Sequence, residues 1–429
     1  MKRMFFLIAF TVSIILLFSA NNTCATDYKS EIKVGLKYGG DTKAFSVSSG
    51  GGIMVYNAQS GALLYTAGND EQLYIEAGST GFAALGKFSA ENTLKISLQP
   101  QNGSLIYCDG KPYRGYILAE LKAAEQICVM NVLGTDDYVA SVLGKEMSYT
   151  WPIEALKAQA VCARNYVLCR GNAHKGYDFD VCATTHCQVY GGYESEHENT
   201  RRAVNETKNI VAKYQGKPVA LYFFATSGGY TENCENVWGN EVGYLKAVED
   251  KYENPQKASR YNWNVTLTRT QIEEKLKNAG ANIGTLKSIA VNEVSSSGRV
   301  TKLTFTGSES SYTAKLEKCR TVLGLYSQKF SITSDGAASA VTTAGKADAP
   351  LSVLSADGLG KPVALKAING AYSIGEVSLL SAESENYIIT GHGYGHGVGM
   401  SQWGARGMAE SGFSYTDILH HYFTNITLD

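Results

Sequence analysis

The amino-acid sequence predicts an α+β fold, in which a β-rich N-terminal part precedes a mixed helix/strand core that carries a smaller inserted α/β region. Short apolar runs separated by Gly, Asn and Ser dominate residues 26–131, whereas helical periodicity begins after residue 132. The 429 residues are 44% hydrophobic and 18% charged, which is typical of a globular chain of several modules.

Residues 1–25 have the layout of a secretory signal peptide or membrane anchor. Lys2 and Arg3 precede an apolar run at 4–17, and small residues near Ala25 suit a cleavage site. A membrane span needs about 20 apolar residues, so cleaved and uncleaved forms both stay open. We expect the body of the protein outside the cytoplasm, secreted or anchored in the cell membrane. The net charge of −1 and the lack of a basic tract argue against nucleic acid as a partner.

The β-rich part, 26–131, should consist of short strands, because apolar runs with a period of two alternate with turn residues. We expect them at IKVGLKY, GIMVYN, ALLYT, LKISLQ, SLIYC and GYILAEL.

The mixed core, 132–256, should open with two helices. Asp136 is a plausible N-cap of the first, and Pro152 suits the first turn of the second, which should run to about Cys169. Ser195–Glu198 fits a capping box before a third helix, and NIVAKY with VALYFFAT reads as a hairpin.

The inserted region, 257–385, should begin with a helix at Thr270–Glu273, followed by a strand at VTKLTFTG and a helix at YTAKLEKCRTVLG. Residues 331–385 are small, polar and Gly-rich, with strands such as PVALKA, and suit hairpins or a partly mobile segment. The C-terminal segment, 386–429, should run from a strand through a Gly-rich loop into two helices.

One carboxylate stands out on the first predicted helix. Val139, Val142, Leu143 and Glu146 share a helical face by their spacing, so Glu146 should sit against an apolar wall. Desolvation raises a glutamate pKa above its reference of about 4.3, and a general acid near neutral pH needs about 6 to 7. The alternative is a partly exposed Glu paired with a Lys or Arg.

A second cluster carries metal-ligand chemistry. His174, Cys182, His186 and Cys187 offer the thiolate and imidazole donors that zinc takes in tetrahedral sites. His186 and Cys187 are adjacent, and strand alternation would send them to opposite faces, leaving three ligands. Structural zinc, a three-ligand zinc with a water, and a loop whose cysteines pair or stay free are the alternatives.

Two Gly-rich loops complete the candidate residues. FFATSGGYTENCENVWG contains Ser227, and GHGYGHGVGMSQWGARG contains His392, His396, Ser401 and Gln402. No GxSxG elbow and no GxGxxG phosphate loop is present, so a serine nucleophile and a phosphate site are not predicted. Imidazoles and a Trp around a flexible loop suit a carbohydrate cleft, and a tightly packed glycine turn is the alternative.

Five segments in this order resemble the stage II sporulation protein D family, which includes amidase enhancers. They are KEMSYTWPIEALKAQAVCARNYVL, TTHCQVYGG, ATSGGYTE, RTVLGLYSQKFSI and GHGYGHGVGMSQWGA. The resemblance extends from about residue 30 to the C-terminus. It implies an extracytoplasmic protein acting on peptidoglycan, with sporulation members behaving as lytic transglycosylases on glycan strands stripped of stem peptides. The family's acid falls on Glu146, while Lys145 and Tyr149 depart from the pattern and blur the subfamily.

The resemblance therefore implies a lytic transglycosylase that cleaves the MurNAc–GlcNAc bond to anhydro-muramic ends, in sporulation or engulfment. One carboxyl group can protonate the glycosidic oxygen and then deprotonate the C6 hydroxyl, whereas a hydrolase needs a second carboxylate about 5 Å or 6.5–9.5 Å away. Nothing in the sequence marks Asp178, Asp180 or Glu232 as that second group. The alternatives are a non-catalytic glycan-binding enhancer of a cell-wall amidase and a zinc hydrolase, although no HExxH or similar general-base motif accompanies the cluster.

For a lytic transglycosylase of this family, we expect the catalytic core at 132–256 and the C-terminal segment to form one cleft, and we expect a structural zinc to support the core. The expected partners are glycan strands, a cell-wall amidase and other sporulation cell-wall proteins. The expected substrate-binding residues of the cleft are Gln159, Arg164, Ser227, His392, His396, Ser401 and Gln402.

Overall fold

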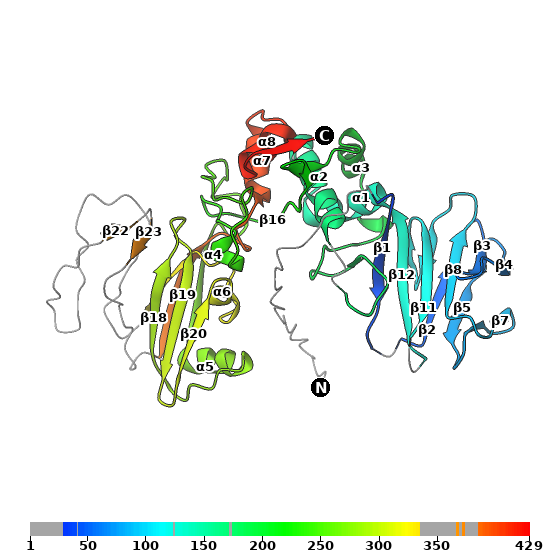
Figure 1. The fold of residues 1–429 in the computed structure, drawn as a ribbon, viewed down its shortest axis with the longest axis horizontal. Coiled ribbons are helices and arrows are strands. Elements are labelled where there is room, and N and C mark those ends of the chain that lie inside the picture. Colours follow the sequence, from blue (N-terminus) through cyan, green and yellow to red (C-terminus); the bar gives the residue numbers. More distant parts are fainter. Residues whose placement is uncertain are drawn as a thin grey trace, which may run out of the picture. The chain divides into compact units, whose positions relative to one another are not determined.

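The computed structural model describes residues 29–40, 42–122, 125–170, 174–334, 366–368, 371–373 and 385–429 (Figure 1). Contacts divide the chain into a large unit, Asn22–Phe223 with Gly399–Asp429, and a small unit, Phe224–Val398. These limits differ from the predicted boundaries at 256/257 and 385/386. The segment predicted as a signal or anchor lies outside the described residues. Within the part of the chain that is described, no helix has the length and apolar content that crossing a membrane requires.

The large unit holds most of the regular structure. Its strands are β1 (Glu31–Lys37), β2 (Ala44–Ser48), β3 (Ile53–Asn57), β4 (Leu63–Ala67), β5 (Leu73–Ala77), β6 (Phe82–Ala84), β7 (Phe88–Ala90), β8 (Lys95–Pro100), β9 (Ile106–Cys108), β10 (Lys111–Tyr113), β11 (Tyr116–Leu121), β12 (Ile127–Gly134), β13 (Val181–Cys182), β14 (Ala212–Tyr214), β15 (Lys217–Pro218), β25 (Met400–Ser401) and β26 (Ile426–Leu428). Its helices are α1 (Thr135–Glu146), α2 (Ile153–Cys169), the 3-10 turn η2 (Tyr193–Ser195), α3 (Glu198–Glu206), α7 (Gln402–Glu410) and α8 (Tyr415–Tyr422). Strand β16 (Phe223–Phe224) stands at the boundary of the units.

Two sheets make up the β-rich part, shown in blue and cyan in Figure 1. The first has the order β13-β1-β12-β11-β8-β3-β4, and the second has the order β10-β9-β2-β5-β6-β7. Strand β12 pairs antiparallel with β1 and β11 and is buried along nearly its whole length, which explains its continuous apolar run. The α+β prediction and the strand-rich N-terminal part are confirmed.

The helices of the large unit pack around α2, which contacts α1, α3, α7 and α8. The α2 side chains are therefore buried almost all the way round. On α1, Val139, Val142 and Leu143 are fully buried, as their spacing predicts. This packing fixes the helix end that carries Glu146.

Two predicted caps are wrong. Helix α1 begins at Thr135 after Gly134, so Asp136 lies in the first turn, where its charge favours the helix dipole. Helix α3 is capped by His197, which forms a capping box with Thr200. Ser195 cannot cap it, because its hydroxyl belongs to η2 and donates to the carbonyls of that turn and of α1.

The small unit combines three-stranded sheets with short helices. Its elements are β17 (Asn262–Thr268), β18 (Leu286–Val294), β19 (Val300–Gly307), β20 (Ser311–Lys315), β21 (Phe330–Ser334), β22 (Lys366–Ile368), β23 (Ala371–Ser373), β24 (Asn386–His392), α4 (Glu235–Trp238), α5 (Arg269–Asn278) and α6 (Lys318–Thr321). The sheet orders are β17-β24-β21 and β18-β19-β20, and both sheets contribute to one apolar core around Phe305, Leu276 and Ile389.

The strand at VTKLTFTG is confirmed as β19, but the helix predicted at YTAKLEKCRTVLG is wrong. Its first half is β20, whose Ala314 points into the core while its neighbours are exposed, and only α6 is helical. Helix α5 starts after Thr268, which caps it together with Gln271, two residues earlier than predicted. The segment 331–385, where hairpins or a partly mobile segment were predicted, lies mostly outside the described residues.

A close contact between α1 and η2 yields a prediction. A Cβ on Gly144 would lie 1.7 Å from the Ser195 carbonyl oxygen. Gly144→Ala should therefore destabilise the protein by about 1–3 kcal/mol, despite the better helix propensity of Ala, because backbone must move. Urea unfolding measures this effect, with the exposed neighbour Lys145→Ala as the control. Equal or greater stability of Gly144→Ala would contradict the packing.

Candidate functional site

Glu146 is the last residue of α1, and its side chain is half-buried. Gln402 Nε2 lies 3.4 Å from Glu146 Oε2 and donates to it, and the backbone amide of Val189 also hydrogen-bonds the carboxylate. These contacts come from the start of α7 and from the loop after β13, so segments far apart in the chain meet at this one carboxyl group.

Burial raises the pKa of Glu146 above its usual value, and the hydrogen bonds from Gln402 and Val189 oppose this shift without cancelling it. No Lys, Arg or His of the described ranges forms a salt bridge with Glu146. The carboxylate also sits at the C-terminal end of a helix, where the helix dipole disfavours negative charge. The site can therefore hold a proton on Glu146 closer to neutral pH than an exposed glutamate can.

Ser401 and Gln402 have different roles at the start of α7. Ser401 is fully buried, and its Oγ caps the helix by accepting a bond from the Gly404 amide at 3.2 Å. Gln402 is the next residue and reaches Glu146. The structure therefore supports Gln402 as a direct neighbour of the acid and gives Ser401 a positioning role instead of the predicted substrate contact.

Gln159 and Arg164 are fully buried in α2, so their side chains are not placed to contact a sugar. Arg164 Nη2 lies 3.2 Å from Asp136 Oδ1 and also bonds a carbonyl at the end of α3. It thus ties α2 to the first turn of α1 and to α3. The Gln159 amide has no hydrogen-bond partner among the described residues. The predicted sugar contacts of both residues do not fit this burial.

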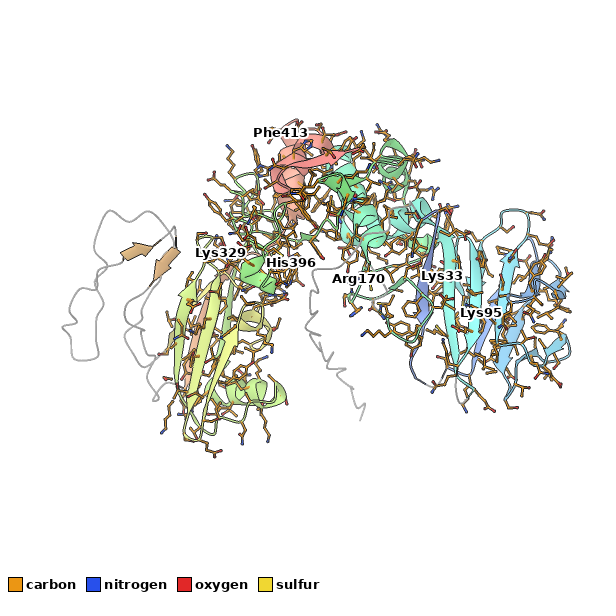
Figure 2. The ribbon with its side chains drawn as sticks, in the orientation of Figure 1. Lys33, Lys95, Arg170, Lys329, His396 and Phe413 are labelled. Atoms are coloured by element: carbon orange, nitrogen blue, oxygen red, sulfur yellow. The ribbon has the colours of Figure 1, made fainter. Side chains whose placement is uncertain are left out.

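Ser227, His392 and His396 belong to the small unit. Ser227 is fully buried, with its amide donating to Glu253 Oε1 at 2.6 Å, so a substrate contact through its hydroxyl does not fit. His392 is exposed, and its Nδ1 lies 2.7 Å from Asn262 Oδ1. His396, labelled in Figure 2, is half-buried and accepts a bond from the Val398 amide.

Although His392 is exposed, partial desolvation of its ring, together with the charge of Lys329, lowers its pKa. A neutral imidazole at this exposed position can both donate and accept hydrogen bonds. His392 and His396 therefore stay candidates for contacts with sugar hydroxyls within the small unit.

Close packing explains two glycines of the 391–399 loop. A Cβ on Gly393 would lie 2.7 Å from the Thr226 carbonyl oxygen, and one on Gly397 would lie 2.7 Å from the Arg299 guanidinium. Both residues also have φ in the left-handed region. At these two positions, a tightly packed turn is sufficient to explain the glycine.

The cluster of His174, Cys182, His186 and Cys187 converges on one point. The four candidate ligand atoms all lie within 4.8 Å of one another. Cys187 Sγ is 3.3 Å from His174 Nε2 and 3.5 Å from His186 Nδ1, and Cys182 Sγ is 3.9 Å from His186 Nδ1. A tetrahedral zinc with usual bond lengths separates sulfur and nitrogen ligands by about 3.6 Å. The donor set and its spacing fit zinc.

The argument that strand alternation leaves only three of these residues as ligands is wrong. His186 and Cys187 lie in a turn after β13, not on a strand, so both side chains can face the same point. The hydrogen bond between the two thiols lowers the pKa of Cys182 and raises the pKa of Cys187, so one thiol of the pair is favoured as the thiolate that binds metal. Four protein ligands would make a closed, structural site.

The other carboxylates considered as a second catalytic group already have partners. Asp178 Oδ2 lies 2.6 Å from Lys95 Nζ and 3.0 Å from Lys33 Nζ, two lysines of the β-rich part (Figure 2). Asp180 pairs with Lys29. Glu232 is fully buried in the small unit and accepts bonds from Ser295 and Ser297.

Sequence reasoning missed the Val189 amide and the pairing of Glu146 with Gln402. Every residue except proline has an amide, so no side-chain pattern marks Val189. Gln402 was a candidate only through its loop, because 256 positions separate it from Glu146.

Comparisons with known proteins find similarity to stage II sporulation proteins. A family model described as stage II sporulation protein matches residues 123–214, and a model described as a domain of unknown function matches residues 243–345. The chain is 31% identical over 335 residues to an uncharacterized protein of Brachyspira hyodysenteriae, covering 78% of this chain and 76% of that protein.

Two relatives from Bacillus subtilis have descriptive names. The chain is 30% identical over 389 residues to an amidase enhancer, covering 83% of this chain and 51% of that protein, so it spans about half the enhancer's length. It is 27% identical over 310 residues to stage II sporulation protein D, covering 67% of this chain and 72% of that protein.

The raised pKa of Glu146 predicts a dependence of stability on pH. A raised folded-state pKa means that the folded protein binds more protons than the unfolded chain, so wild-type stability falls as pH rises from the ordinary glutamate pKa through the raised value. Glu146→Gln removes that loss, so its stability relative to wild type should increase between pH 4 and neutral pH. Urea unfolding at several pH values measures this difference.

The matched control is Glu410→Gln, which changes the last residue of α7, an exposed glutamate paired with Arg406. The difference in stability between Glu410→Gln and wild type should not increase between pH 4 and neutral pH. A flat difference for Glu146→Gln across this range would show that the carboxyl group is not desolvated.

Proposed function

The chain belongs to the stage II sporulation protein D family, and from that premise we propose that it is a lytic transglycosylase that cleaves the MurNAc–GlcNAc bond of peptidoglycan glycan strands. The observation that carries the proposal is the desolvated carboxyl group of Glu146, which has amide donors and forms no salt bridge with any described residue. The names of the relatives support a role in the cell wall during sporulation, and hence a location outside the cytoplasm.

In the proposed reaction, protonated Glu146 donates its proton to the glycosidic oxygen as the bond to the MurNAc anomeric carbon breaks. The resulting carboxylate then accepts the proton of the MurNAc C6 hydroxyl, whose oxygen bonds to the anomeric carbon and closes the anhydro ring. Glu146 loses one proton in the first step and regains one in the second, so the reaction needs no second carboxylate. The pairing of Asp178, Asp180 and Glu232 with other groups supports this route over hydrolysis.

Gln402 suits a supporting role in both steps. Its amide N–H stabilises the carboxylate that forms after the first proton transfer, while burial favours the protonated form before it. Activity should fall as pH rises above the raised pKa, because the donor form is then lost.

The second candidate function is a non-catalytic glycan-binding enhancer of a cell-wall amidase. The similarity to an amidase enhancer favours it, although the chain covers only about half of that protein. A binder has no use for a desolvated acid, which is why we favour the enzyme.

The test is digestion of purified glycan strands, with and without stem peptides, followed by mass spectrometry of the ends. Wild type should release anhydro-muramic ends, from stripped strands above all. Glu146→Gln and Glu146→Ala should lower the rate by about 10² to 10⁴, the usual contribution of a general acid/base, while Glu410→Gln should retain the wild-type rate.

Reducing ends would mean hydrolysis. Intact strands that still bind wild-type protein, together with a faster amidase in the same mixture, would favour the enhancer.

We also propose that His174, Cys182, His186 and Cys187 hold a structural zinc. The convergence of the four ligand atoms supports it. When bound, the metal would crosslink the segment after α2 to the turn that leads to Val189. Metal analysis of the purified protein should give about one zinc per chain, and Cys182→Ser should lose it together with thermal stability.

The buried Cys162 is not part of the cluster, so Cys162→Ser provides the matched control and should retain the metal. Absence of zinc from wild-type protein purified without chelators would contradict the proposal.

A further inference from the structure

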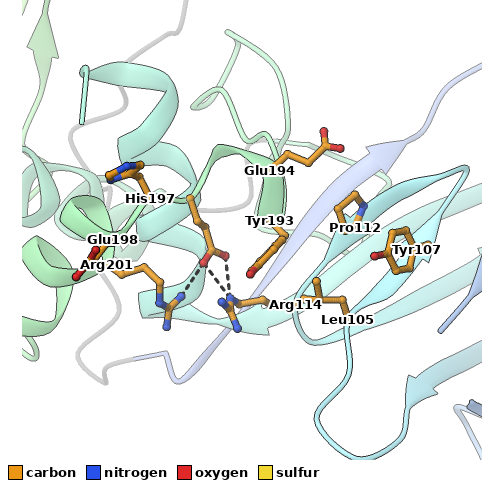
Figure 3. A pocket seen from close by; sticks show the side chains of 10 residues that line it. Leu105, Tyr107, Pro112, Arg114, Tyr193, Glu194, His197, Glu198 and Arg201 are labelled. Atoms are coloured by element: carbon orange, nitrogen blue, oxygen red, sulfur yellow. Dashed lines mark hydrogen bonds and ion pairs between the residues drawn. The ribbon is translucent and has the colours of Figure 1, made fainter. Parts of the chain in front are cut away.

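A hollow of about 510 Å³ lies within the large unit, apart from the contacts of Glu146 (Figure 3). Tyr107 of β9 and Arg114, which follows β10, line one side, and Tyr193 of η2 and Arg201 of α3 line the other. None of these residues was a candidate from the sequence, because the hollow joins the β-rich part to the helical core.

The polar groups of the hollow are held in fixed positions. The carboxylate of Glu196 is 5% exposed and accepts bonds from Arg114 Nε at 2.9 Å and from Arg201 Nη1 at 2.9 Å. Both arginine side chains remain about one-third exposed, and the Nη groups of Arg114 form no hydrogen bond with any described residue. Preorganised N–H donors therefore face the hollow.

Aromatic rings supply the apolar part of the wall. Tyr107 and Tyr193 are each 39% exposed, and the Arg114 guanidinium stacks on the Tyr193 ring at 4.8 Å. The two sides approach closely because residue 192 is glycine: a Cβ there would lie 2.8 Å from the Pro112 carbonyl oxygen. Exposed rings beside rigid planar donors suit a ligand with apolar faces and polar edges, as a sugar ring has.

The hollow is connected to Glu146 through the segment after β13. Val189 bonds the acid, and six residues later Ser195 packs against Gly144 and lies 2.9 Å from Ser141 Oγ on α1. Tyr149, three residues after the acid and 46% exposed, stacks on His197 with ring centroids 3.8 Å apart. His197 in turn lines the hollow.

Charge decides which class of ligand fits. The lining carries two arginines against three glutamates, Glu194, Glu196 and Glu198, a formal charge of −1. Such a lining disfavours a negatively charged group at this position, and it suits a neutral ring with hydroxyl and acetamide groups.

We infer that this hollow is a second glycan subsite, which binds a neutral N-acetylhexosamine unit of a strand whose other units reach Glu146. The identity of the strand rests on the proposed function. The binding itself does not depend on catalysis.

The test measures binding of neutral N-acetylglucosamine oligomers of six units by calorimetry, using the full chain with Glu146→Gln to prevent cleavage. Adding Tyr107→Ala and Tyr193→Ala together should weaken binding about tenfold, as expected for losing two aromatic contacts at a binding hot spot. The control is Tyr74→Ala, which removes a 59% exposed tyrosine of β5 that is not part of the lining and should leave the affinity unchanged. Circular dichroism confirms that each variant is folded.

Unchanged affinity in the double tyrosine variant, or an equal loss in Tyr74→Ala, would overturn the subsite. Binding of stem-peptide fragments in place of the sugar oligomer would also overturn it. The result is independent of the proposed reaction: if Glu146→Gln cleaved strands like wild type, the catalytic proposal would fail while the oligomer affinities would still decide the subsite.

Discussion

The desolvation of one carboxyl group at the end of α1 is the constraint on which the rest of the site depends. A lysine or arginine beside Glu146 would lower its pKa and leave it ionised at neutral pH. The helix avoids this because Lys145, the neighbouring cation, is exposed. The groups that do reach the carboxylate are amides from Gln402 and Val189, which orient it and stabilise its charge less than a cation would.

A short segment with little regular structure, from Cys182 to His197, connects three features of the large unit. It begins in the four-residue cluster, passes the amide of Val189 at the acid, and ends in the wall that contains Tyr193. Such a segment has few backbone bonds of its own, so its position depends on crosslinks and close contacts. The packing of Gly144 on Ser195 provides such a contact at one end, and the proposed zinc would provide a crosslink at the other.

The sequence predicted those features of the fold that depend on local hydrophobic periodicity. Val139, Val142 and Leu143 identified the buried face of α1, and alternation identified β19. It could not predict what depends on distant contacts. Arg164 resembles a surface residue until Asp136 is placed opposite it, and the hollow needs β10, η2 and α3 together. The predicted cap of α1 is wrong because Asp136 is equally suited to the first turn. All four cluster residues were candidate ligands, but the argument against a fourth ligand was wrong because His186 and Cys187 lie in a turn and not on a strand.

The energetics of Glu146 also bear on the choice between an enzyme and a binder. At neutral pH an ionised carboxylate in this position costs free energy, because burial removes water and no cation in the described part of the chain pairs with it. A glutamine would make the same hydrogen bonds to neighbouring amides without a charge, and a binding surface would lose little by the exchange. The proposed reaction needs the Glu146 carboxyl group protonated in the first step and ionised in the second. A glutamine can replace neither form. The raised pKa of Glu146 therefore supports the proposed chemistry at this residue, in line with the general tendency of groups with perturbed pKa values to lie at functional sites.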